Sequence, residues 1–239
     1  MSRYQLIAAI VFAGTSVAIA AADADPEGAT PPSPPEHFLI HEELWTELAD
    51  EPAQHMDRAR EVFLSVDARE AAVQIRKAAT YLRITAAQAA DGSKRALLRS
   101  AQELEGLAHR VEAGTVKSVG ELDAAFARAL HALSHHHCVL AERSWMARQN
   151  ERAGKQLRAA ADNLEKAAAR TGRALQTGTA AVVKETRLAA GKLVEGTGFV
   201  VDEIGKGFAR FGKQVEDVGK GIEPHAAPAT GAVALPTRE

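Results

Sequence analysis

One stretch of the chain gathers side chains of the types that bind transition metals. From residue 131 to residue 142 it reads His-Ala-Leu-Ser-His-His-His-Cys-Val-Leu-Ala-Glu. On a helix, His131, His135, Cys138 and Glu142 share one narrow stripe, because their spacings are four, three and four residues. Imidazole, thiolate and carboxylate groups are ligands of soft and borderline metal ions. The stripe therefore predicts a metal site, and the alternative is an ordinary packing or solvated face.

Two other pairs of histidines are further candidates for a metal or haem site. His55 and His137 are equivalent in an internal repeat described below, and two imidazoles facing each other across a bundle could ligate a metal or haem iron. His37 and His41 are four residues apart and flanked by acids. The alternatives are core histidines bonded to neighbouring polar groups and a solvated first helix. No Cys-x-x-Cys-His motif occurs in the sequence, so covalent haem attachment is excluded.

The elements that must position these residues are expected to be helices. No proline lies between Pro52 and Pro224, and this stretch is rich in Ala, Leu, Glu, Arg and Lys. Such a composition predicts an all-α fold and argues against a sandwich, a barrel or a doubly wound sheet. The pattern predicts helices at 37–50, 53–65, 68–90, 94–113, 119–148 and 151–171, followed by a helical region that reaches residue 222.

An internal repeat, with a constant offset of 82 in residue number, organises the predicted bundle. Phe63 aligns with Trp145 at the end of a helix, and a turn follows in both copies. The next helix then matches at Ala71, Gln74, Arg76, Ala78, Ala79, Leu82 and Ala86 against Ala153, Gln156, Arg158, Ala160, Ala161, Leu164 and Ala168. The sequence therefore predicts two related αα-hairpins packed in a bundle. Chance similarity between Ala-rich helices is the alternative.

The C-terminal region repeats every seven residues. Glycines recur at Gly191, Gly198, Gly205, Gly212 and Gly219, beside an apolar stripe that includes Val201, Ile204, Phe208 and Phe211. A glycine groove permits close backbone approach, so the region is expected to dock a partner helix, itself or a membrane. Its charges balance, which favours a helix over an anionic membrane surface. It could form one straight helix of about 48 Å or fold back near residues 196–198.

The two ends of the chain differ in composition from its body. Residues 1–24 have a basic start, an apolar run from Leu6 to Ala20 and small residues at the exit, as in a secretory signal peptide. Residues 25–36 are a Pro-rich linker, 37–171 the helical bundle, 172–222 the glycine-heptad extension and 223–239 a disordered tail. With a diderm bacterial source, this order predicts a periplasmic protein. Cys138 is the only cysteine, so no internal disulfide can form.

Charge and motifs narrow the function classes. The net charge is −2, which argues against nucleic acid as the main partner. No nucleophile elbow, phosphate loop or dinucleotide fingerprint occurs, so an enzyme is not expected. The sequence predicts an exported structural or interaction protein whose glycine-heptad extension docks a partner. The alternative function is a periplasmic protein that buffers or senses a transition metal or haem.

Overall fold

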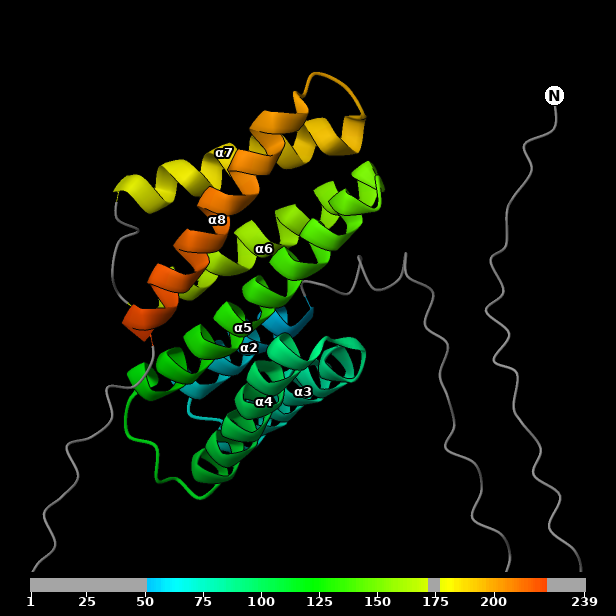
Figure 1. Cartoon of the computed structure of the whole chain (residues 1–239). Helices are drawn as coiled ribbons and strands as arrows, with labels where there is room; N and C mark the ends of the chain where they lie inside the picture. Colours follow the sequence, from blue (N-terminus) through cyan, green and yellow to red (C-terminus); the bar gives the residue numbers. More distant parts are fainter. Residues whose placement is uncertain (1–50, 172–176, 223–239) are drawn as a thin grey trace, which may run out of the picture. The chain divides into compact units, whose positions relative to one another are not determined.

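The computed structural model describes residues 51–171 and 177–222, which belong to one compact unit spanning Ile40–Glu239. This part of the chain is an all-α bundle without a strand, as the sequence predicts (Figure 1). Its seven helices are α2 (Glu51–Leu64), α3 (Ala68–Gln88), α4 (Asp91–Glu112), α5 (Val119–Met146), α6 (Asn150–Arg170), α7 (Thr177–Glu195) and α8 (Val201–Ile222). The predicted signal peptide, linker, first helix with His37 and His41, and tail lie outside the described residues.

Helices α5 and α6 lie in the middle of the bundle. Helices α2, α3 and α4 pack on one side of them, and α7 and α8 pack on the other (Figure 1). The buried apolar residues form two clusters, one mainly from α2 to α5 and the other from the end of α5 with α6, α7 and α8. Because α5 contributes to both clusters, it joins the two halves of the bundle.

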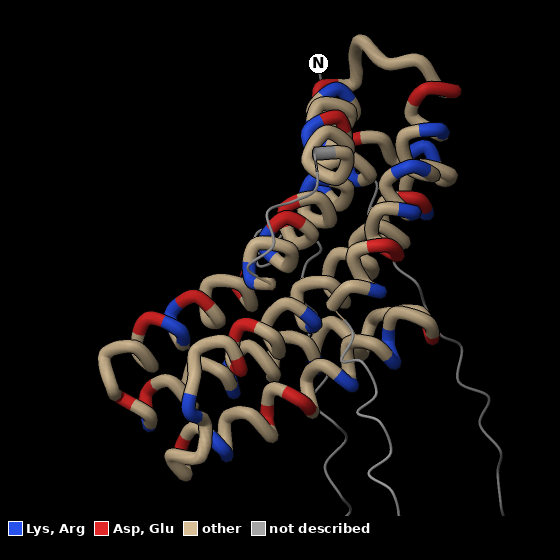
Figure 2. Tube along the Cα trace, turned by 90° about the vertical axis from the view of Figure 1, so that its left-hand side faces the viewer, with Lys and Arg blue, Asp and Glu red and all other residues tan. Residues whose placement is uncertain are grey.

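Each helix buries one stripe of small and aliphatic side chains. In α4 the 4-3-4-3 spacing predicts one such stripe, and its members are at most 1% exposed: Leu97, Ala101, Leu104, Ala108 and Val111. Charged residues cover the opposite faces, and Figure 2 shows Lys and Arg interleaved with Asp and Glu along the helices. Burial of the stripes drives packing, since apolar area removed from water is the main favourable term in folding.

Two turns have the same geometry although neither uses glycine. After α2, the Val66 N–H bonds to Phe63 and the Asp67 N–H to Val62; after α5, the same two bonds recur at residues 148 and 149. This is the Schellman pattern, which places one residue in the left-handed region. That residue is Val66, with φ 67°, or Arg148, with φ 59°. Asp67 also caps α3 by accepting a bond from the Glu70 N–H at 3.0 Å, as predicted.

The left-handed conformation of Val66 leads to a stability prediction. Valine is β-branched, and a positive φ costs an L-residue roughly 1–2 kcal/mol. The side chain is 90% exposed and contributes little packing in return. We expect Val66→Gly to raise the free energy of unfolding by about 1 kcal/mol, measured by urea denaturation. Arg148→Gly is the matched control and should give a smaller gain, and a loss of stability in Val66→Gly would contradict the prediction.

The C-terminal region forms a helical hairpin, not one straight helix. Helix α7 ends at Glu195, and Gly196 and Gly198, both with φ 71°, reverse the chain before α8 begins. Helix α8 then lies against α5, α6 and α7. Its apolar stripe is buried there, so a straight helix would leave Phe208 and Phe211 in water. Of the two predicted arrangements, the structure therefore has the folded-back one.

Candidate functional site

His131 holds helix α8 against α5. Its Nε2 atom lies 2.7 Å from the Val215 carbonyl oxygen on α8. The imidazole also packs on Gly219, where an added β-carbon would lie 2.6 Å from the His131 ring. His135, one turn further along α5, points to α4 instead, with Nδ1 3.3 Å from the Ser93 hydroxyl. The two imidazoles of the predicted stripe thus contact different helices.

Cys138 and Glu142 are close to each other on α5. The Cys138 thiol lies 3.9 Å from a Glu142 carboxylate oxygen. Burial, with the neighbouring Glu142, raises the pKa of the Cys138 thiol to about 12, so the free thiol is protonated at physiological pH. Burial also raises the pKa of Glu142. Among the described residues, no three His, Cys, Asp or Glu side chains gather around one metal position.

His55 and His137 make equivalent contacts. Each imidazole Nδ1 lies 2.7 Å from the Oε1 atom of a glutamine 19 residues later, Gln74 or Gln156. Since a glutamine Oε1 accepts, Nδ1 carries the proton in both pairs. Each pair ties the two helices of one hairpin together. The two glutamines are among the residues that match in the predicted repeat. This match was the signal in the sequence that could have indicated the two equivalent His–Gln contacts.

His136 is a buried group to which the sequence assigned no role. Its side chain is buried on α5, and its ring lies 5.5 Å from that of His137. Burial lowers the pKa of His136 to about 3, with smaller effects from His137, His135 and Arg143. It is therefore neutral at physiological pH. No local feature of the histidine run in the sequence indicated that His136 would be buried with a lowered pKa.

The residues predicted to dock a partner fall into two groups in α7 and α8. Ile204, Phe208 and Phe211 are buried inside the bundle, whereas Val201 is 63% exposed. Gly198 lies in the turn after α7. The other four glycines lie in helices: Gly191, which faces the Arg158 guanidinium; Gly219, which faces His131; and Gly205 and Gly212, which have no heavy atom within 4 Å of an added β-carbon.

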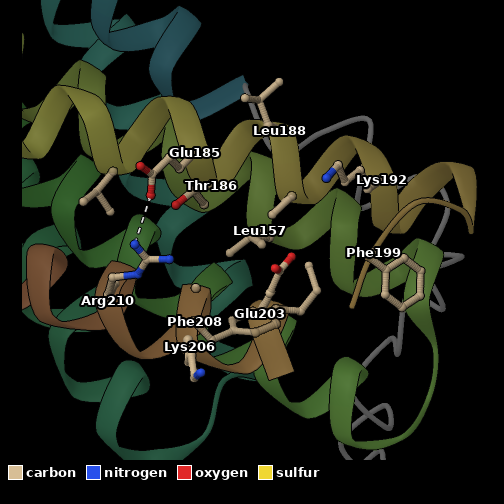
Figure 3. Close-up of a pocket in the computed structure, with 14 residues that line it drawn as sticks. Leu157, Glu185, Thr186, Leu188, Lys192, Phe199, Glu203, Lys206, Phe208 and Arg210 are labelled. Atoms are coloured by element: carbon tan, nitrogen blue, oxygen red, sulfur yellow. Dashed lines mark ion pairs between the residues drawn. The ribbon is translucent and has the colours of Figure 1, made fainter. Parts of the chain in front are cut away.

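A groove of about 350 Å³ runs between α7 and α8 (Figure 3). Leu157, Ile204 and Phe208 form its apolar floor, and an ion pair between Arg210 and Glu185, with 3.3 Å between Nη1 and Oε2, lies at its side. Trp145 contacts two of the lining rings, with centroids 5.8 Å from Phe199 and 6.4 Å from Phe208. The sequence analysis did not predict this groove, because it left open whether the C-terminal region folds back on the bundle.

No protein-family model, curated protein or solved structure matches this chain. In the described part, no helix has both the length and the apolarity required to cross a membrane.

Proposed function

We propose that the bundle is built from a repeated unit of three helices, with an offset of 82 in residue number between copies. The first unit is α2–α4 and the second is α5–α7, and α8 begins a third. The helix bounds support this proposal. The ends of α2 and α5, both ends of α3 and α6, and the starts of α5 and α8 are all separated by this same offset.

The pattern of burial gives further support. Nine positions of α3 are buried, and each has a buried counterpart at the same offset in α6. The stripe of α4 corresponds in the same way to five buried residues of α7: Thr179, Val183, Thr186, Ala190 and Leu193. Chance similarity between Ala-rich helices would not place the same positions inside throughout both units.

Ion pairs between helices recur at the same offset. Arg128 on α5 pairs with Glu103 on α4, and at the equivalent positions Arg210 on α8 pairs with Glu185 on α7. A second pair recurs with its charges exchanged. Arg83 on α3 pairs with Glu105 on α4, whereas Glu165 on α6 pairs with Arg187 on α7. Exchanged charges at paired positions are expected when two copies diverge while keeping a contact.

We infer that this stacked bundle is an exported, non-enzymatic structural or interaction protein of the periplasm. Stacked helical units commonly serve as binding scaffolds, because each unit contacts only its neighbours and leaves surfaces free. The histidines and Cys138 support this reading through their contacts, since His131, His55 and His137 hold helices together. These contacts favour packing over the alternative, a metal or haem carrier.

The observation that carries the proposal concerns the glycines of α8. A glycine inside a helix costs roughly 1 kcal/mol relative to alanine. The contact with His131 explains Gly219, but an added β-carbon at Gly205 or Gly212 would meet open space. Packing within the chain therefore gives no reason for these two glycines. We propose that they admit a helix of another molecule to the side of α8, next to the exposed Val201.

A photo-cross-linking experiment tests this docking surface. A cross-linking residue at Ala209, between the two glycines in the sequence and exposed, should give a defined adduct in cells. Gly205→Leu with Gly212→Leu should abolish the adduct without unfolding the protein, because both positions have room for a side chain. The mass of the adduct distinguishes a second copy from a different envelope protein. An unchanged adduct in the double variant, or no adduct at all, would count against the proposal.

A further inference from the structure

At two positions along the groove between α7 and α8, α7 carries smaller side chains than its counterpart. In the first unit, Leu104 and Leu107 of α4 are fully buried. Under the repeat relation of the proposed function, on which this comparison rests, the corresponding residues are Thr186 and Ala189 of α7. Both line the groove. At these two positions the first unit has leucines where the second unit has smaller side chains.

An open apolar space of this kind is suited to an apolar ligand. A volume of about 350 Å³ lies within the range of small-molecule pockets, roughly 300–1,000 Å³. The floor formed by Leu157, Ile204 and Phe208 is at most 5% exposed, so it is well ordered by the bundle. Leu188 at the edge is 61% exposed and would be covered by a bound chain.

The charges at the groove favour an anionic head group. Arg210 and Glu185 neutralise each other. Glu203 lies in the first turn of α8, where the helix dipole stabilises its carboxylate, and it contributes a negative charge to the groove. Lys192 on α7 and Lys206 on α8 also line the groove, and within the described residues neither forms an ion pair (Figure 3). Lys192, Lys206 and Arg210 thus exceed Glu185 and Glu203 by one positive charge, which favours a ligand that carries a negative charge at the end of an aliphatic chain.

We propose that the α7–α8 groove binds a single-chain anionic amphiphile, such as a fatty carboxylate. The aliphatic chain lies on Leu157, Ile204 and Phe208 in place of the two leucines of the first unit. The carboxylate lies at the rim between Lys192 and Lys206. This site is separate from the glycine surface, because Gly205 and Gly212 do not line the groove.

Trp145 provides a native reporter of binding, since its ring contacts Phe199 and Phe208. In full-length protein carrying Trp45→Phe, dodecanoate below its micelle concentration should saturate a change in Trp145 emission. Dodecyltrimethylammonium, which has the same chain and the opposite charge, should bind at least tenfold more weakly. The same assay with phosphatidylglycerol vesicles separates a soluble amphiphile from a membrane. A response to vesicles alone, or equal affinity for both detergents, would overturn the proposal.

Three variants locate the site. Ala189→Leu restores the residue type of the first unit and should weaken dodecanoate binding at least tenfold. Lys192→Gln with Lys206→Gln should weaken it by a similar factor, and Glu203→Gln should strengthen it severalfold. Lys184→Gln is the matched control, because Lys184 is exposed on α7 and outside the groove. Circular dichroism identifies any variant that fails to fold, and the lysine pair tests the site without altering its packing.

The dodecanoate-binding test is independent of the cross-linking test of the docking surface at Gly205 and Gly212. Gly205→Leu with Gly212→Leu should retain full dodecanoate affinity, and Ala189→Leu should retain the cross-linked adduct at Ala209. If the parent protein formed the adduct but did not bind dodecanoate, this inference would be wrong and the proposed function would remain. If dodecanoate affinity were the same in Ala189→Leu as in the parent protein, the groove would not be the site.

Discussion

Replacement of Gly154 by alanine is expected to destabilise the protein by about 2 kcal/mol. Gly154 lies on α6 at its contact with α7, and an added β-carbon would lie 2.6 Å from the Ala190 carbonyl oxygen. It would also lie 2.8 Å from Val194 Cγ2 and 3.0 Å from Leu193 Cβ. The first of these neighbours is backbone, so helix α7 must move away. The gain in helix propensity, up to about 1 kcal/mol, offsets only part of the cost.

Urea unfolding followed by circular dichroism and Trp145 fluorescence measures this effect. Gly212→Ala is the matched control, because nothing lies within 4 Å of its β-carbon position. We expect this control to be neutral or to gain up to about 1 kcal/mol. In the proposed repeat, the corresponding position in α3 is Ala72, which is fully buried, so α3 accommodates a methyl group there. Equal stabilities of Gly154→Ala and Gly212→Ala would show that α6 and α7 pack less closely than described.

Acid is expected to unfold the protein through His136. Its pKa in the folded state is lowered to about 3 by burial, from a usual value of 6.5. The unfolded chain therefore takes up a proton first, and the folded state loses stability as the pH falls from 6.5 towards 3. The slope for one such group is about 1.4 kcal/mol per pH unit. Over this window the loss is a large part of the roughly 5–15 kcal/mol that stabilises a typical domain.

His136→Phe isolates this contribution. Phenylalanine keeps an aromatic ring beside His137 but takes up no proton, so its unfolding free energy should depend less steeply on pH. Urea denaturation at intervals between pH 7.5 and 4.5 measures both proteins. Above pH 6.5 the two plots of unfolding free energy against pH should run parallel. Below pH 6.5 their slopes should differ by the amount that corresponds to the uptake of about one proton. Parallel curves over the whole range would mean that His136 is protonated as readily in the folded state as in the unfolded state.

Local signals in the sequence were sufficient for the helices. The bounds predicted for α5, 119–148, differ from the observed Val119–Met146 only at the end of the helix. The stripe of α4 and the cap at Asp67 were also predicted, because both depend on residues within one or two turns. Gly114 follows α4 with φ 67°, the left-handed conformation typical of a glycine after a helix.

Contacts between distant segments were not predictable in the same way. The four side chains of the predicted metal stripe do share a helix face, but α8 returns to that face 84 residues later and bonds to His131. Nothing within α5 signals this return. Prediction of the groove would also require a comparison between distant segments. The small size of Thr186 and Ala189 is informative only beside the two leucines at the corresponding positions of α4. The spacing of residues in the sequence identifies which side chains share a face of a helix, but tertiary packing determines which other helix covers that face.

The ion pair whose charges are exchanged between the two units affects which helices can pair correctly while the chain folds. Two similar units in one chain risk misassembly, with α3 pairing α7 in place of α4. In that arrangement Arg83 would meet Arg187, and the counterpart error would bring Glu165 to Glu105. Each wrong pairing sets like charges together, whereas each correct pairing joins opposite charges. If the two units are copies as proposed, we expect this contact, which adds little to the stability of the finished bundle, to help each unit to discriminate its own helix from the copy.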